Sequence, residues 1–231
     1  MVSVVMAAYN EAATVGRAVA DVTGHPQVSE VIVVDDGSSD DTARRAADAG
    51  ARVLRMGRNR GKAAALETGV AAAGSDVLLF LDADVTGLTH EAISAIVRPV
   101  VEGRVDMHVG LRARKTLWLN RLLRVFPIIG GERALSRRIW NLVPERHKRG
   151  YRIEVALNYT AKRFGVGMSF DLVTGVTHRT KEGKFGWRRG LLRRLDMIGQ
   201  VIAVTWNLYI IGGIRDSLPR VRSKRIDDRS G

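Results

Sequence analysis

The stretch Val77–Val85, VLLFLDADV, is an apolar run that ends in two carboxylates one residue apart. Five consecutive apolar residues between Asp76 and Asp82 are typical of a strand buried on both faces, as in a parallel sheet covered by helices. Ligands of open α/β sheets bind beyond the C-terminal ends of the strands, so chemistry is expected at Asp82 and Asp84. Alternation along an extended backbone predicts that both carboxylates point the same way.

The two carboxylates offer hard oxygen ligands. Mg2+ and Mn2+ prefer such ligands and keep coordination positions open for phosphate oxygens. Asp82 and Asp84 therefore predict a divalent-cation site, with Mn2+ or Mg2+ as the cofactor. Taken without its context, an Asp-x-Asp pair is equally explained by a solvated acidic turn after a strand.

More strand and helix patterns precede this stretch. Strands are predicted over Val2–Ala8, Val31–Val34 and Ala51–Leu54, and helices over Ala12–Val22, Thr42–Ala49 and Ala63–Ala73. With the strand Val77–Leu81, they make four strands that alternate with three helices in about 85 residues. This succession predicts an α/β fold with a doubly wound, mostly parallel sheet, in a single domain over residues 1–231.

The composition excludes several kinds of site. The chain has 231 residues, 45% of them hydrophobic, which is enough for a full core. It has no cysteine, which excludes a disulfide scaffold, a thiolate metal site and a cysteine nucleophile. The N-terminus passes directly into a strand pattern without a basic leader, so we expect no secretory signal and a cytoplasmic protein.

Charge is distributed unevenly along the chain. Residues 1–100 hold 9 Lys and Arg against 13 Asp and Glu, a net charge of −4, whereas residues 101–231 hold 28 against 11, a net charge of +17. A basic block of this size indicates a polyanionic partner, namely nucleic acid, an anionic lipid surface or a phosphorylated substrate. The chain has no zinc-finger spacing, RNP-like aromatic run or clear helix-turn-helix, so nucleic acid is disfavoured.

Four short motifs follow one another at strand ends and before a helix within residues 1–100. They are AYNE at 8–11, DDGS at 35–38, NRGK at 59–62 and DAD at 82–84. Together they resemble the nucleotide-sugar-binding half of family-2 glycosyltransferases, most closely the dolichol- and polyprenol-phosphate sugar transferases. The resemblance covers residues 101–231 only loosely. It implies the glycosyltransferase A fold with a Rossmann-like nucleotide half, a nucleoside-diphosphate-sugar donor and a divalent cation.

The resemblance also implies roles for individual residues. The donor-site residues are Ala8, Tyr9 and Glu11 around the nucleoside, Asp36 at the base or ribose, Lys62 near the donor, Asp82 near the ribose or sugar, and Asp84 on the metal. The chemistry agrees, because carboxylates accept hydrogen bonds from ribose hydroxyls and base N–H groups. The alternatives are a solvated lysine at a helix start for Lys62 and a first-turn acid favoured by the helix dipole for Glu11.

Two segments of the second half resemble acceptor-side segments of the same family. These are residues 130–137, GGERALSR, and residues 150–154, GYRIE. Glu154 precedes an apolar helix predicted over Val155–Phe164, so we expect it in the cleft as a catalytic base or an acceptor-orienting group. The alternative is a helix N-terminal carboxylate without a role in the reaction. The chain lacks the Thr-Glu-Asp and Gln-x-x-Arg-Trp signatures of processive synthases, which favours a non-processive enzyme.

His178 ends a strand predicted over Val173–Thr177. Some enzymes of the glycosyltransferase A fold add a histidine from a late strand as a metal ligand, and His178-Arg179 resembles this feature. The resemblance implies a metal site formed by Asp82, Asp84 and His178. The alternative is a surface or packed histidine.

The basic half mixes charged and large apolar side chains in the manner of a membrane-contacting segment. This pattern holds for Arg112–Arg124, and six basic residues over 181–194 precede the uncharged stretch Met197–Ile214. That stretch is at the lower length limit for a membrane span and contains polar residues, whereas its apolar residues fall on one helical stripe. We expect a helix-rich C-terminal part, with this helix docked on the core or in peripheral contact with the inner face of the cell membrane.

The resulting hypothesis is a metal-dependent glycosyltransferase that moves a sugar from a nucleoside-diphosphate sugar to a lipid-phosphate or another anionic acceptor. A soluble sugar transferase acting on a small phosphorylated acid is the first alternative. A nucleotidyltransferase is the second, although it would be expected to carry a glycine-rich basic loop where this chain has Tyr9-Asn10-Glu11. The third is a binding module that holds metal and nucleotide without turnover.

Overall fold

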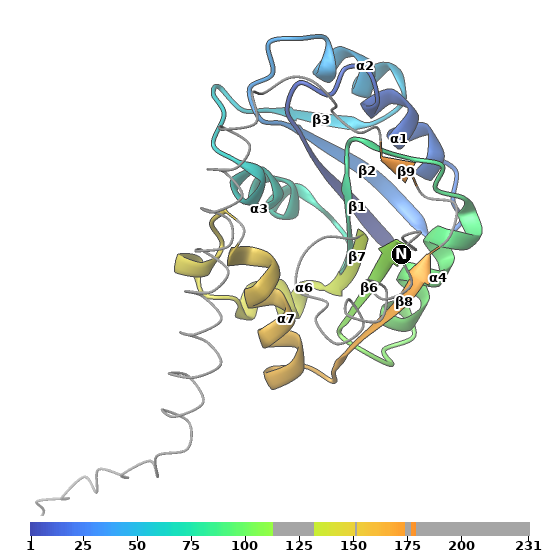
Figure 1. Cartoon of the computed structure of the whole chain (residues 1–231), viewed down its shortest axis with the longest axis vertical. Helices are drawn as coiled ribbons and strands as arrows, with labels where there is room; N and C mark the ends of the chain where they lie inside the picture. Colours follow the sequence, from blue (N-terminus) through green and yellow to red (C-terminus); the bar gives the residue numbers. More distant parts are fainter. Residues whose placement is uncertain (113–131, 151, 174–176, 179–231) are drawn as a thin grey trace, which may run out of the picture.

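The computed structural model describes residues 1–112, 132–150, 152–173 and 177–178 (Figure 1). The strands are β1 (Val2–Ala8), β2 (Val28–Asp35), β3 (Arg52–Arg55), β4 (Val77–Asp82), β5 (Val85–Thr86), β6 (Met107–Arg112), β7 (Glu132–Ser136), β8 (Met168–Val173) and β9 (Thr177–His178). The helices are α1 (Val15–Val22), α2 (Thr42–Asp48), α3 (Lys62–Ala72), α4 (His90–Val101), α6 (Arg137–Leu142) and α7 (Arg152–Phe164), with a 3-10 turn η1 (Glu145–His147).

The described strands form a seven-stranded sheet in the order β3-β2-β1-β4-β7-β6-β8 and a two-stranded ladder of β5 and β9. In the large sheet β1 is parallel to β2 and β4, β2 to β3, and β6 to β8, whereas β7 is antiparallel to both neighbours. The predicted α/β fold with a mostly parallel sheet is therefore confirmed. One sheet joins strands from residues 1–100 to strands from the second half of the chain.

Helices cover both faces of the large sheet, which makes it doubly wound (Figure 1). Buried residues of α1 and α4 form one core together with Met6 and Leu79. Buried residues of α3, α6 and α7 form a second core together with Val5 and Phe80. Successive residues of β1 and β4 thus face opposite helical layers, as expected for strands buried on both sides.

The chain order of the strands creates a switch point between β1 and β4. From β1 the chain passes outward to β2 and β3, and it then returns to β4 on the other side of β1. Ligands of open α/β sheets bind at such a point, outside the carboxyl ends of the strands. β1 ends at Ala8 and β4 ends at Asp82, so the motifs that follow these strands lie at this edge.

Two elements predicted in the first half start three residues away from their observed first residues, whereas the other predicted ends before Val85 differ from the structure by at most one residue. The helix predicted from Ala12 begins at Val15, because the preceding residues form a turn closed by hydrogen bonds to the Glu11 carbonyl. β2 begins at Val28 and not at Val31, because its first residues pair with β1 although they are polar or only half-buried. Both differences arise from backbone hydrogen bonds that a local apolar pattern does not report.

The strand predicted over Val173–Thr177 corresponds to parts of two elements. β8 ends at Val173, and the short strand β9 starts at Thr177, while residues 174–176 lie outside the described part of the chain. β9 is antiparallel to β5, the strand that follows the Asp-x-Asp motif. Its position is set by pairing with a remote segment and not by the length of the local apolar run.

Residues 113–131 and 179–231 lie outside the description, and with them most of Arg112–Arg124, the basic residues over 181–194 and all of Met197–Ile214. The membrane contact expected for these segments stays a prediction. Among the helices that the structure describes, none combines the length and the apolar character needed to cross a membrane.

Candidate active site

A pocket of about 530 Å³ lies where β1, β2 and β4 end. All residues predicted for the donor site line it: Ala8, Tyr9, Glu11, Asp36, Lys62, Asp82 and Asp84. Ala7, Asn59, Gly61 and Ala83 complete the lining. Four motifs that are far apart in sequence meet here, because parallel strands bring their C-terminal ends to one edge of the sheet.

Hydrogen bonds to the neighbouring loop and to α2 fix the turn after β1. Asn10 has a left-handed backbone with φ of 54°, which asparagine adopts more readily than most residues. Its N–H donates to Ser38 Oγ over 2.9 Å, and the Glu11 N–H donates to Thr42 Oγ1 over 2.8 Å. These bonds hold Tyr9, which is 46% exposed, and Glu11 at the pocket. Asn10 and Ser38 therefore have a structural role that sequence reasoning did not assign.

Asp36 anchors the loop that leads into α3. Its buried carboxylate accepts the Arg60 N–H at Oδ1 over 2.7 Å and the Gly61 N–H at Oδ2 over 2.8 Å. Each carboxylate oxygen has a second lone pair, so Asp36 can also accept a hydrogen bond from a ligand in the pocket. Sequence reasoning predicted only the ligand contact. The adjacent Asp35 accepts the Ser38 N–H instead and is not part of the lining.

Gly37 allows the loop after β2 to approach the loop before α3. Its φ of 75° lies in the left-handed region, and a Cβ at this position would be 2.7 Å from the carbonyl carbon of Arg58. Any side chain would therefore strain the backbone and displace the loop that contributes Asn59 and Gly61 to the pocket.

Replacing Asp36 with alanine is expected to weaken binding of the nucleoside-diphosphate donor by about 10-fold or more. The change removes a ligand acceptor and two charge-assisted hydrogen bonds to the loop, and each bond to a charged group is worth about 1.5–3 kcal/mol. Calorimetric titration with a series of nucleoside diphosphates in the presence of Mn2+ measures the effect. Asp48→Ala, at an exposed position on α2, is the matched control. An unchanged dissociation constant for Asp36→Ala would remove Asp36 from the binding site.

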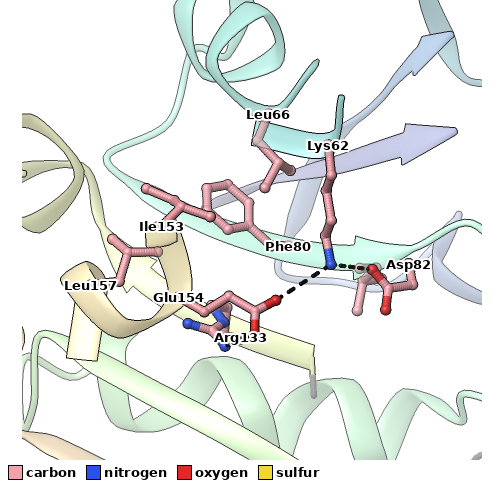
Figure 2. A pocket seen from close by; sticks show the side chains of 9 residues that line it. Lys62, Leu66, Phe80, Asp82, Arg133, Ile153, Glu154 and Leu157 are labelled. Atoms are coloured by element: carbon pink, nitrogen blue, oxygen red, sulfur yellow. Dashed lines mark hydrogen bonds and ion pairs between the residues drawn. The ribbon is translucent and has the colours of Figure 1, made fainter. Parts of the chain in front are cut away.

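Lys62 starts α3 and pairs with the last residue of β4 (Figure 2). Its Nζ lies 2.6 Å from Asp82 Oδ1. Phe80 faces the α3 layer, so Asp82, two residues further along β4, faces it too. Burial acts to lower the pKa of Lys62, although 47% of the side chain is exposed, but the carboxylates of Asp82 and Glu154 reverse the shift and raise that pKa. The ammonium therefore stays charged at neutral pH, which excludes Lys62 as a neutral base.

Glu154, in the first turn of α7, lies between two cations (Figure 2). Its Oε1 is 3.7 Å from Lys62 Nζ, and its Oε2 is 3.7 Å from Arg133 Nη2. Arg133 is 3% exposed, and its Nη1 has no hydrogen-bond partner among the described residues. A buried donor left unsatisfied costs roughly 1–3 kcal/mol, so this guanidinium favours an anionic or polar ligand beside it.

The register of β7 explains the position of Arg133. β7 is antiparallel to β4, and Arg133 pairs with Phe80, so its side chain shares a sheet face with Phe80 and Asp82. Sequence reasoning placed residues 130–137 near the acceptor but did not single out Arg133. The register of an antiparallel strand is not contained in its local pattern, although an arginine inside a buried strand was a usable signal.

Glu154 does not line the large pocket but borders a small cavity of about 20 Å³ together with Arg133. Lys62 and Asp82 line both spaces and so join them. The two residues predicted to be catalytic, Asp84 and Glu154, therefore border different cavities that share one ion pair.

The structure brings part of the predicted metal site together. Asp82, at the end of β4, and Asp84, in the turn before β5, both line the large pocket and offer the oxygen donors that Mg2+ and Mn2+ prefer. The backbone of His178 pairs with Val85, the residue after Asp84. Within the described residues, no group of three or more His, Cys, Asp or Glu side chains is close enough to hold a metal ion.

The fold and the four motifs at this pocket define a class of protein. Residues 3–158 match the model of Glycosyl transferase family 2, and the chain belongs to this family. The family predicted from the AYNE, DDGS, NRGK and DAD motifs is thus confirmed.

Curated relatives cover different parts of the chain. The succinoglycan biosynthesis protein ExoU of Rhizobium meliloti (strain 1021) is 44% identical over 88 residues, which are 36% of this chain and 26% of that protein. Glucosyl-3-phosphoglycerate synthase of Mycolicibacterium paratuberculosis (strain ATCC BAA-968 / K-10) is 29% identical over 219 residues, 78% of this chain and 66% of that protein. The chain thus spans between 26% and 66% of the length of these relatives.

Crystal structures of glucosyl-3-phosphoglycerate synthase from Mycobacterium tuberculosis share the fold. A complex with Mg2+ and uridine diphosphate (UDP) has a TM-score of 0.73 at 26% identity, over 90% of this chain and 78% of that chain. A complex with Mn2+, UDP-glucose and phosphoglyceric acid has a TM-score of 0.72 at 26% identity, over 90% and 79%. The predicted glycosyltransferase A fold is confirmed, and these complexes contain the two cations predicted from the Asp-x-Asp motif.

Proposed function

We propose that this chain is a metal-dependent, non-processive glycosyltransferase that moves a sugar from a UDP-linked donor to a small phosphorylated acceptor. The observation that carries the proposal is the position of Lys62, which joins the pocket of the donor motifs to the cavity bordered by Glu154 and Arg133. The likeness to glucosyl-3-phosphoglycerate synthases supports it. Residues 1–100 would form the nucleotide-sugar half and residues 101–231 the acceptor half of one domain.

In this proposal the nucleoside diphosphate occupies the large pocket. Ala8, Tyr9 and Glu11 surround the nucleoside, and Asp36 accepts a hydrogen bond from the base or ribose. Lys62 stands at the N-terminus of α3, whose N-cap residue Gly61 has no side chain to accept a hydrogen bond from the first turn. The N–H groups of a first helical turn have no partner within the helix, so they and the positive end of the helix dipole favour an anion there, and the Lys62 ammonium adds a full charge.

Asp84, with Asp82 and His178, would hold Mn2+ or Mg2+. Such a cation would neutralise the negative charge of the departing diphosphate. Lys62 would also help to neutralise the diphosphate, because its ammonium group lies beside Asp82 and lines the pocket.

The acceptor would enter on the side of Glu154. Arg133 and Lys62 bind its anionic group, since guanidinium and ammonium groups form charge-assisted hydrogen bonds with phosphate and carboxylate oxygens. Glu154 orients the acceptor hydroxyl and takes its proton. The acceptor oxygen then bonds to the anomeric carbon of the sugar, and the bond from that carbon to the diphosphate oxygen breaks.

A lipid-phosphate acceptor at the inner face of the membrane would present the same kind of anionic group, attached to a lipid chain instead of a small acid. The relatives whose complexes contain phosphoglyceric acid favour the small acid. The nucleotidyltransferase alternative is disfavoured, because the chain has Tyr9-Asn10-Glu11 after β1 and belongs to a glycosyl transferase family.

The test is a screen of nucleotide sugars, followed by transfer assays. UDP with Mn2+ is expected to raise Tm by about 5–10 °C, since a ligand at 100 times its Kd adds about 2.7 kcal/mol to the free energy of unfolding. With the matching UDP-sugar, transfer is expected to 3-phosphoglycerate or glycerol 3-phosphate. A polyprenyl phosphate in vesicles is the comparison acceptor.

The outcomes separate the alternatives. Transfer to the polyprenyl phosphate alone would replace the small acceptor by the lipid and keep the donor assignment. Stabilisation by UDP and Mn2+ without turnover of any donor would indicate the binding module. The absence of stabilisation by every nucleotide and metal tested would overturn the proposed donor site.

A further inference from the structure

The loop between β3 and α3 separates two hollows. Asn59 and Gly61 line the donor pocket, whereas Arg58 and Arg60 line a second hollow of about 640 Å³, together with Met56, Gly57 and Thr68. Successive residues of one loop thus belong to different spaces. The two arginines lie next to the donor pocket but are not part of its lining.

The charges of these arginines are poorly compensated. The guanidinium groups of Arg52 and Arg55 on β3 each lie within 4.0 Å of a carboxylate, whereas no carboxylate of the described residues lies within that distance of the guanidinium groups of Arg58 and Arg60. Both are exposed to solvent. Residues 1–100 carry a net charge of −4, so this hollow is locally positive within a half of the chain that is negative as a whole.

Glu67 on α3 is an acid that interacts electrostatically with Arg60. Burial and a hydrogen bond with Glu145 raise the pKa of the Glu67 carboxyl, against the opposing charges of Lys148 and Arg60. Glu67 therefore binds a proton more readily than an ordinary glutamate.

The backbone that carries the arginines is held in place. Asp36 accepts hydrogen bonds from the N–H groups of Arg60 and Gly61, and Gly37 packs against the backbone of Arg58. A ligand that binds both guanidinium groups therefore restricts only the two side chains, because the loop backbone is already fixed. This lowers the entropic cost of binding.

We propose that the hollow lined by Arg58 and Arg60 binds the phosphate group of a ligand other than the sugar donor. Guanidinium groups match phosphate oxygens with two parallel hydrogen bonds, and two of them can share one phosphate. Inorganic phosphate and a phosphate monoester present the same oxygens, so the site accepts either. The proposal is independent of sugar transfer.

The test is an NMR titration of the full chain with inorganic phosphate, in EDTA and at constant ionic strength. The Nε–Hε signals of Arg58 and Arg60 are expected to shift together and to saturate, whereas those of Arg52 and Arg55 shift little. Glycerol phosphate, titrated in a second series, distinguishes a monoester site from a site for the free ion. Addition of UDP and Mg2+ in excess over EDTA is expected to leave phosphate bound.

Charge-matched variants complete the design. Arg58→Gln combined with Arg60→Gln is expected to weaken phosphate binding at least about 10-fold, which corresponds to 1.4 kcal/mol, whereas Arg52→Gln combined with Arg55→Gln retains it. Unchanged backbone amide spectra verify folding. Small, non-saturating shifts of all four arginines would show an adventitious ion only and overturn the proposal. Displacement by UDP and Mg2+ would also overturn it, because the phosphate would then lie in the donor pocket.

Discussion

Asp84→Ala is expected to lower the rate of sugar transfer by at least about 10³-fold and to leave the fold intact. The factor corresponds to about 4 kcal/mol in the transition state, the scale of losing a group that stabilises charge on a departing diphosphate. Asp84 lies in the turn between β4 and β5, is half-buried and lines the donor pocket, so its replacement does not open a cavity inside an apolar core.

Initial rates at saturating donor and Mn2+, together with thermal unfolding, measure the effect of Asp84→Ala. Asp48→Ala, an exposed aspartate at the end of α2, is expected to keep the wild-type rate. Transfer by Asp84→Ala near the wild-type rate in metal-replete buffer would leave the Asp-x-Asp motif as a solvated turn. A large fall in Tm would assign Asp84 to stability instead.

Glu154→Gln is expected to lower kcat by about 10²–10⁴-fold, the usual contribution of a positioned general base. Glutamine keeps the shape of the side chain but removes the charge that lies 3.7 Å from both Lys62 and Arg133. Glu154 does not line the donor pocket, so the Kd of UDP is expected to change less than about 3-fold. Steady-state kinetics and UDP titration measure the two quantities separately.

Glu91→Gln is the matched control for this prediction. Glu91 is also a glutamate in the first turn of a helix, α4, but it lies outside both cavities. Its replacement is expected to leave kcat unchanged. Equal activity of the two variants would show that Glu154 is only a helix N-terminal carboxylate, which is the alternative left open by the sequence.

The donor side of the site could be predicted from sequence because its information is local. In a parallel sheet, a polar residue just after an apolar run lies at the ligand-binding edge whatever the strand order. Asp82, Asp84 and Asp36 each follow such a run, and the structure places all of them on one pocket. The strand–helix succession also predicted the mostly parallel sheet.

The other features depend on pairing between remote segments. Arg133 reaches the small cavity only because β7 runs antiparallel to β4 with Arg133 opposite Phe80. Asp36 anchors the Arg60 and Gly61 amides, a contact that exists only after two loops meet. The local hydrophobic pattern determines neither the strand register nor the contact between the loops. The sequence therefore predicts the residue types but not these contacts.

The positively charged ammonium group of Lys62 borders both cavities. A ligand that binds the Lys62 ammonium in one cavity changes the position of this charge for a ligand in the other cavity. Under the proposed function, the binding free energies of donor and acceptor are therefore linked. Thermodynamic linkage is reciprocal: the factor by which the donor changes the affinity for the acceptor equals the factor by which the acceptor changes the affinity for the donor. A single lysine thereby makes the affinity for each substrate depend on the concentration of the other.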